Sequence, residues 1–101
     1  MSIFPTTILL ATDGSEETQL AATTVADLAE KTNSELHVTT VGAGLPISAA
    51  AEEIAEVAEE IDAGVLVMGS RGHSRLRRAL VGSVSDAVVR HAHCPVTIVR
   101  K

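Results

Sequence analysis

The sequence has few aromatic residues and a single cysteine, and each shortage excludes a class of protein. Phe4 is the only aromatic residue among 101, with no Trp or Tyr. Nucleic-acid readers of the RRM and OB-fold types stack bases on aromatic side chains, so those classes are disfavoured. Cys94 is the only cysteine, so no internal disulfide can form. The chain therefore has no need of an oxidising compartment.

Membrane and polyanion signals are also missing. No apolar run approaches the ~20 residues needed to span a bilayer. Residues 1–7 lack the basic flank and apolar stretch of a signal peptide. We therefore expect a cytoplasmic protein without a membrane partner. The net charge of −5 disfavours nucleic acid as a partner, because proteins that bind the phosphate backbone need a basic surface.

Two common nucleotide motifs are absent as well. The sequence contains no Gly-Lys-Ser/Thr, so it is not a P-loop NTPase. Gly42-Ala43-Gly44 does not complete a dinucleotide fingerprint, because Ile47 occupies the third glycine position.

Charge is distributed unevenly along the chain. Glutamates crowd one segment and arginines another, namely Glu52, Glu53, Glu56, Glu59 and Glu60, and then Arg71, Arg75, Arg77 and Arg78. A local basic cluster in an acidic chain favours a small anionic ligand over a long polyanion. We interpret the glutamates as a solvated helix face, with protein binding as the less favoured alternative.

Apolar runs alternate with helical patterns along the chain, which at 46% hydrophobic content is expected to form one domain over residues 1–101. The predicted strands are 8–11, 36–41, 65–68 and 96–99, and the predicted helices are 15–32, 47–61 and 84–91. This βαβαβαβ order predicts a three-layer α/β fold, with an open parallel sheet of about four strands and right-handed crossovers.

The loop after the third predicted strand carries the most specific chemistry. It begins with Gly69-Ser70-Arg71-Gly72 at a strand end and finishes with Gly82-Ser83-Val84-Ser85 at a helix start. Glycines let backbone N–H groups approach a phosphate, and a helix N-terminus favours an anion. Arg71 or Arg75 would add charge. Ser83-x-x-Asp86 also fits a capping box, so these residues alone leave phosphate binding and a plain helix start equally open.

Three stretches of the chain match one family. The first is residues 8–15, near the N-terminus. The second is the spacing Gly69-x2-Gly72-x9-Gly82-Ser83. The third is residues 83–90 together with His93-Cys94-Pro95-Val96, near the C-terminus. Together they resemble the universal stress protein family in its ATP-binding branch, over most of the chain. The resemblance implies a Rossmann-like fold of the adenine nucleotide alpha hydrolase type.

The resemblance also implies a role for each matching position. Asp13 would hydrogen-bond the ribose, although a turn residue that caps the first helix stays the alternative. Ala11 and Val38 would frame the adenine, partly through backbone groups, and Met68 and Gly69 would pack near the sugar. The residues around the phosphates would be Gly72, His73, Gly82, Ser83, Val84 and Ser85. The implied ligand is ATP, AMP or ADP, with Mg²⁺ or Mn²⁺ held mainly by the phosphates.

The chain is shorter than usual members of that family. After the second strand the family runs through a further helix and strand, whereas here residues 42–48 lead directly into the glutamate-rich helix. This loss predicts the strand order 2-1-3-4 and turns the second strand into an edge, with Leu36, Val38 and Val41 less covered. Self-association through edge strands, as a homodimer or higher oligomer, is therefore expected.

Three functional hypotheses follow. The favoured one is a nucleotide-binding regulator of a stress response without catalytic residues. The alternatives are a slow ATPase or self-phosphorylating enzyme, for which His73 is the nearest general base, and a folded fragment with weakened binding. The run His91-Ala92-His93-Cys94 has metal-ligand residue types, but its spacing is too tight for the usual zinc geometry, so we expect no metal site.

Overall fold

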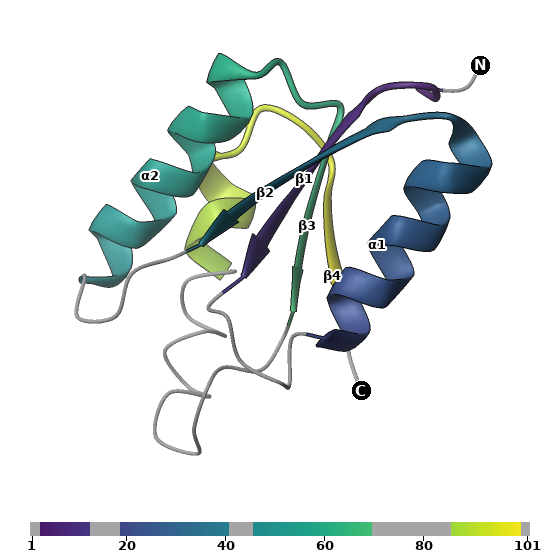
Figure 1. Cartoon of the computed structure of the whole chain (residues 1–101). Helices are drawn as coiled ribbons and strands as arrows, with labels where there is room; N and C mark the ends of the chain where they lie inside the picture. Colours follow the sequence, from purple (N-terminus) through teal and green to yellow (C-terminus); the bar gives the residue numbers. More distant parts are fainter. Residues whose placement is uncertain (1–2, 13–18, 41–45, 70–85, 100–101) are drawn as a thin grey trace.

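The computed structural model describes residues 3–12, 19–40, 46–69 and 86–99 (Figure 1). Its elements are β1 (Thr7–Thr12), α1 (Gln19–Thr32), β2 (Glu35–Thr40), α2 (Ile47–Glu60), β3 (Val65–Gly69) and β4 (Val96–Val99). A helical stretch over residues 86–91 precedes β4. All four predicted strands are present, with bounds that differ from the predictions by at most one residue. Val41, the predicted end of the second strand, lies outside the described residues.

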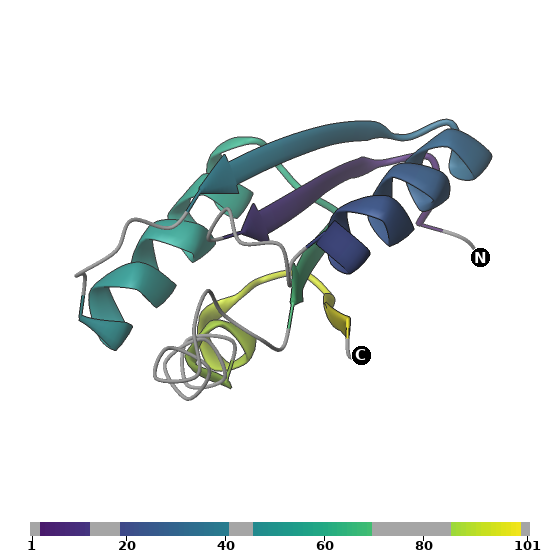
Figure 2. The same cartoon turned by 60° about the horizontal axis from the view of Figure 1, so that its bottom comes forward.

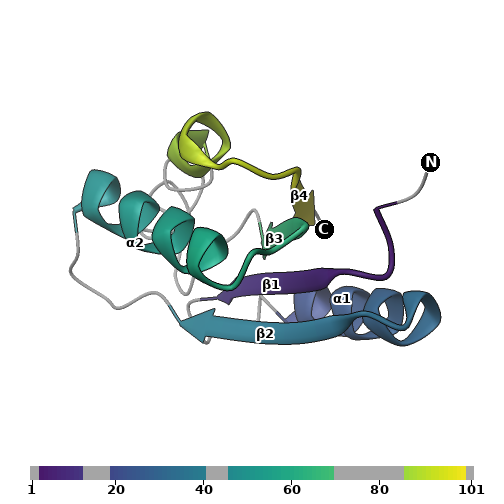
Figure 3. The same ribbon diagram turned by 90° about the horizontal axis from the view of Figure 1, so that it is seen from above.

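The four strands form one parallel sheet in the order β2-β1-β3-β4. Figure 3 shows this succession from above, with β2 at one border of the sheet. Leu9 of β1 lies level with His37 of β2 and with Leu66 of β3. The predicted fold class and strand order are confirmed.

Each face of the sheet carries its own apolar core. Because successive side chains of a strand point to opposite faces, Ile8, Leu10, Val65 and Val67 pack against Ala21, Val25 and Ala29 of α1. Leu9, Ala11, Leu66 and Met68 pack on the other face, against Ala50, Ala51, Ile54 and Ala58 of α2 and Val88 of 86–91. Figures 2 and 3 show α1 and α2 on opposite sides of the strands. The molecule is therefore the predicted three-layer sandwich.

Both long helices end in the same way. At the end of α1, Ser34 N donates to Ala29 O at 2.8 Å and Asn33 adopts a φ of 57°. At the end of α2, Ala63 N donates to Ala58 O at 2.9 Å and Asp62 adopts a φ of 54°. These are Schellman motifs in which Asn or Asp, instead of glycine, takes the left-handed conformation. The end of α2 therefore depends on Asp62.

The β2 border is the least covered part of the sheet. Leu36 packs partly against the α1 core, whereas Val38 is 58% exposed. Leu36 and Val38 lie level with Ile8 and Leu10, whose side chains point toward the α1 layer. The loss of cover predicted for β2 is thus visible at Val38, on the α1 side of the sheet.

Candidate functional site

The carboxyl ends of β1 and β3 form the point where the strand order reverses. The chain runs from β1 outward to β2, then returns across the sheet to β3 and continues outward to β4. In open α/β sheets, ligands bind outside the carboxyl ends of the strands at this reversal. Thr12 ends β1 and Gly69 ends β3, so these two residues mark the edge where a ligand would bind.

Four predicted site residues lie within the described part of the chain, namely Ala11, Val38, Met68 and Gly69. Ala11 lies level with Thr39 on one side and Met68 on the other, one residue before the end of β1. The structure thus brings Ala11, Met68 and Gly69 together at the reversal point. The other predicted residues lie outside the described residues and stay predictions: Asp13, Arg71, Gly72, His73, Arg75, Gly82, Ser83, Val84 and Ser85.

Ala11 and Met68 have buried side chains. Each is 3% exposed and belongs to the core on the α2 side of the sheet. A ligand at the sheet edge would therefore meet their backbone groups rather than their side chains. Val38 lies level with Leu10, so its side chain points to the opposite face from that of Ala11. The contact of these two residues with an adenine ring stays a prediction, and it would involve backbone groups as well as side chains.

Threonines at the strand ends were not among the predicted site residues. Thr12 closes β1, and Thr39 and Thr40 close β2 at the same level of the sheet. Their hydroxyls are donors and acceptors of the kind that a ribose or phosphate uses. The signal that would have found them is their position, directly after the apolar residues of each strand.

Comparison with known proteins identifies the family. A model described as "Universal stress protein family" matches residues 5–50 and 46–100. The chain belongs to this family. Universal stress protein MJ0531 of Methanocaldococcus jannaschii is 42% identical to it over 86 residues, which are 85% of this chain and 48% of that relative. The chain spans about half the length of the curated relatives it matches.

Two solved structures share the fold. The crystal structure of a universal stress protein in complex with cAMP has a TM-score of 0.74 and 25% identity, over 96% of this chain and 98% of that chain. The structure of hypothetical protein MJ0577 has a TM-score of 0.65 and 21% identity, over 98% of each chain. The two segments that match the universal stress protein model meet at residues 46–50. There α2 begins, directly after the region where the resemblance predicts that a helix and a strand are missing.

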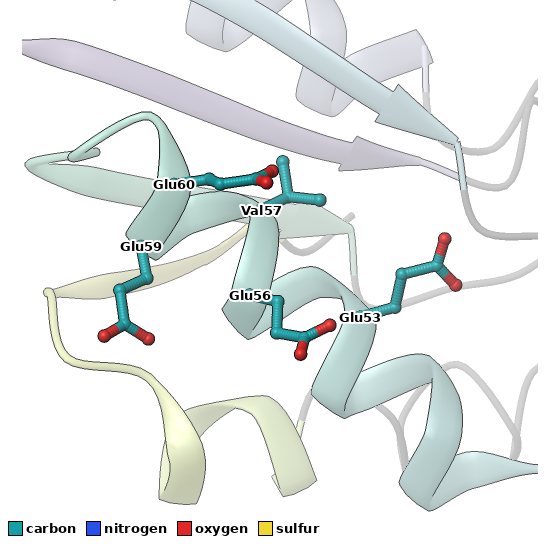
Figure 4. Close-up of a pocket in the computed structure, with 5 residues that line it drawn as sticks. All are labelled: Glu53, Glu56, Val57, Glu59 and Glu60. Atoms are coloured by element: carbon teal, nitrogen blue, oxygen red, sulfur yellow. The ribbon is translucent and has the colours of Figure 1, made fainter.

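One hollow of the described residues lies on α2 of this universal stress protein and is acidic. It has a volume of about 400 Å³ and is lined by Glu53, Glu56, Val57, Glu59 and Glu60 (Figure 4). In Figure 4 the four carboxylates point in different directions. No group of three metal-ligating side chains occurs within the described ranges. Carboxylates repel phosphate, so this hollow does not fit a nucleotide.

A smaller hollow of about 100 Å³ lies between the end of α2 and the turn before β4, and His93 and Cys94 line it together with Glu59 and Asp62. Partial burial raises the pKa of the Cys94 thiol above its ordinary value. The thiol is therefore mostly protonated at neutral pH, and only the thiolate is a nucleophile.

Of the helices that the structure describes, none has the length and apolarity to cross a membrane.

The raised pKa of Cys94 predicts slow alkylation. The rate of reaction with iodoacetamide is expected to rise with pH and to reach half its maximum at a higher pH than in the unfolded chain, because burial penalises the thiolate. Mass spectrometry of quenched samples between pH 7 and 11 measures this rate. The urea-unfolded chain is the control and should show its midpoint at about 8.5, the ordinary pKa of a thiol. A folded-state midpoint below that of the unfolded chain would contradict the burial argument.

Proposed function

We propose that this universal stress protein domain binds an adenine nucleotide, ATP in particular, at the carboxyl ends of β1 and β3. The observation that carries the proposal is the strand order β2-β1-β3-β4, which places the reversal point between these two strands. The predicted phosphate-binding residues follow β3 directly, and Asp13 follows β1. A solved universal stress protein of the same fold is in complex with cAMP, a nucleotide of the same class.

The protein side of the site would consist of three parts. Backbone groups near Ala11 and Gly69 would meet the adenosine, with Asp13 at the ribose. Glycines and hydroxyls of residues 69–72 and 82–85 would surround the phosphates, with charge from Arg71 or Arg75. Mg²⁺ or Mn²⁺ would neutralise the phosphates while using few protein ligands. We further propose that nucleotide occupancy regulates self-association in the cytoplasm.

Nucleotide titration tests the proposal. The purified protein is expected to carry adenine nucleotide, or to be stabilised by ATP, ADP or AMP with Mg²⁺. A ligand at about 100 times its Kd would stabilise the fold by about 2.7 kcal/mol, or about 10–20 °C in Tm. The measurements are nucleotide analysis by chromatography and thermal unfolding.

Two variants locate the site in this titration. Gly82→Val is expected to abolish the ATP-dependent shift, because a branched side chain would block the approach of phosphate to the backbone. Glu53→Gln, in the acidic hollow of α2, is the control and is expected to leave the shift unchanged. The absence of both bound nucleotide and any shift at millimolar ATP would overturn the proposal.

A further inference from the structure

Every second residue of β2 directs its backbone N–H and C=O groups away from β1, toward the outer edge of the sheet. Glu35 N donates to Thr6 O at 3.0 Å, so the backbone groups of Glu35 face β1. In a parallel pair, alternate residues direct both their N–H and C=O to the same neighbour. His37 and Thr39 therefore also face β1, and the groups of Leu36, Val38 and Thr40 point away from it. Among the described strands, none lies beyond β2 on that side.

The same three residues direct their side chains to the α1 face of the sheet. Leu36 and Val38 lie level with Ile8 and Leu10, which pack on α1. Val38 is 58% exposed and is one of the few exposed large apolar residues of the described chain. Edge strands are normally protected by Lys, Pro or a bulge. β2 has the sequence ELHVTT, without Lys or Pro, and pairs with β1 without interruption in register.

We propose that β2 pairs antiparallel with β2 of a second copy of this chain, with Val38 opposite the partner's Val38 on a twofold axis. The two sheets then join into one, with both α1 layers on the same side. Leu36 lies opposite the partner's Thr40, so every outward-facing residue of β2 meets another outward-facing residue. This register forms about six hydrogen bonds between the strands, two for each bonded pair.

The two neighbouring twofold registers, centred on His37 or on Thr39, are poorer, because each pairs only two outward-facing residues of β2 with such residues of the partner. Centring the axis on His37 instead would pair Leu36 with the partner's Val38 and form only about four hydrogen bonds within the strand. It would also place the two His37 side chains directly opposite each other. A shift by a single residue from any of these registers would set α1-face residues against residues of the other face. The register centred on Val38 is thus the one that satisfies the whole edge.

Charge favours the same arrangement. Glu35 and His37 already form a pair within each chain, with 3.2 Å between Oε1 and Nε2. In the proposed register the two Glu35 residues lie at opposite ends of the paired strands, about 20 Å apart at about 3.4 Å per residue. His37 lies opposite the partner's Thr39. No like charges therefore face each other, and the edge is complementary to itself, as a twofold interface requires.

This inference rests on the self-association in the proposed function and names the edge and the register that it uses. Sedimentation velocity over a range of protein concentrations, without nucleotide, tests it independently of nucleotide binding. We expect a dimer that Val38→Lys converts to a monomer. Val89→Lys is the matched control, because Val89 is 53% exposed on the helical stretch 86–91, and it should remain dimeric. A monomeric wild-type protein at millimolar concentration, or a dimer that Val38→Lys leaves intact, would overturn the inference.

Cysteine cross-linking tests the register. In a Cys94→Ser background, Val38→Cys is expected to form a disulfide-linked dimer under mild oxidation. Bonded pairs in antiparallel strands have Cα atoms about 5.5 Å apart, which suits a disulfide. Leu36→Cys is the control, because the two copies of residue 36 would lie about 13 Å apart along the strands. Efficient linkage through Leu36→Cys, with none through Val38→Cys, would refute this register.

Discussion

Leu66→Ala is expected to lower the free energy of unfolding by about 2–5 kcal/mol, since it leaves a cavity in a closed core. Leu66 is 0% exposed in β3, level with Leu9 of β1 and Val96 of β4. Its side chain belongs to the cluster that holds Ile54 of α2 against the sheet. A domain of this size has about 5–15 kcal/mol of stability in total. The substitution would therefore remove a large share of it, measurable by urea unfolding followed by circular dichroism.

Val89→Ala is the control for this measurement. Val89 is 53% exposed, so its truncation is expected to change the stability by less than about 0.5 kcal/mol. If Leu66→Ala cost no more than Val89→Ala, the α2 side of the sheet would not be the closed core described above. The same comparison matters for function, because this core includes Ala11 and Met68, which lie beside the proposed nucleotide site.

The sequence predicted the strands and their order well, for a physical reason. Residues 65–68 form a continuous apolar run, and all of β3 is buried in the structure. A strand covered on both faces has no polar alternation, which is typical of parallel sheets between two helical layers. With short connections and consistent crossover handedness, such strands allow few topologies. The predicted strand order also depended on the resemblance to universal stress proteins, which implied that one helix and one strand of the family fold are missing here.

The faces of the strands could not be predicted in the same way. A run such as Ile8-Leu9-Leu10-Ala11 is apolar at every position, so its sequence does not reveal which side chains meet α1 and which meet α2. Only the pairing register shows that Ala11 and Val38 point to opposite faces. The resemblance to universal stress proteins implied that Ala11 and Val38 frame the adenine, but their positions near the strand ends carry no information about the face.

The role of Gly64 was also beyond the sequence. A glycine shortly after a helix is typical of a helix stop, but Asp62 takes the left-handed conformation at the end of α2. A Cβ at Gly64 would instead overlap Oγ1 of Thr6 and lie 2.9 Å from Cβ of Thr6. Glycine is thus needed for a close approach between the turn before β3 and the start of β1. Such a contact depends on tertiary structure, which no local pattern encodes.

Gly64→Ala is accordingly expected to lower the free energy of unfolding by about 3 kcal/mol, the upper end of the usual range for overpacking. Thr6 cannot easily move away. Its N–H donates to Ser34 Oγ at 3.1 Å, and its carbonyl accepts from Glu35 N at 3.0 Å. Gly64 N also donates to Thr7 O at 2.8 Å, so both sides of the contact are anchored. Urea unfolding of the variant measures the loss.

A double-mutant cycle with Thr6→Ala would show whether this contact is the cause. Alanine at position 6 removes Oγ1 and Cγ2 but keeps Cβ, so the double variant should recover part of the loss, with a coupling of about 1–3 kcal/mol. Fully additive losses would mean that the cost arises elsewhere. The contact lies at the amino ends of β1 and β3, opposite the proposed nucleotide edge. Gly64→Ala should therefore weaken the fold while leaving the stabilisation by ATP unchanged, which separates the scaffold of the sheet from its proposed site.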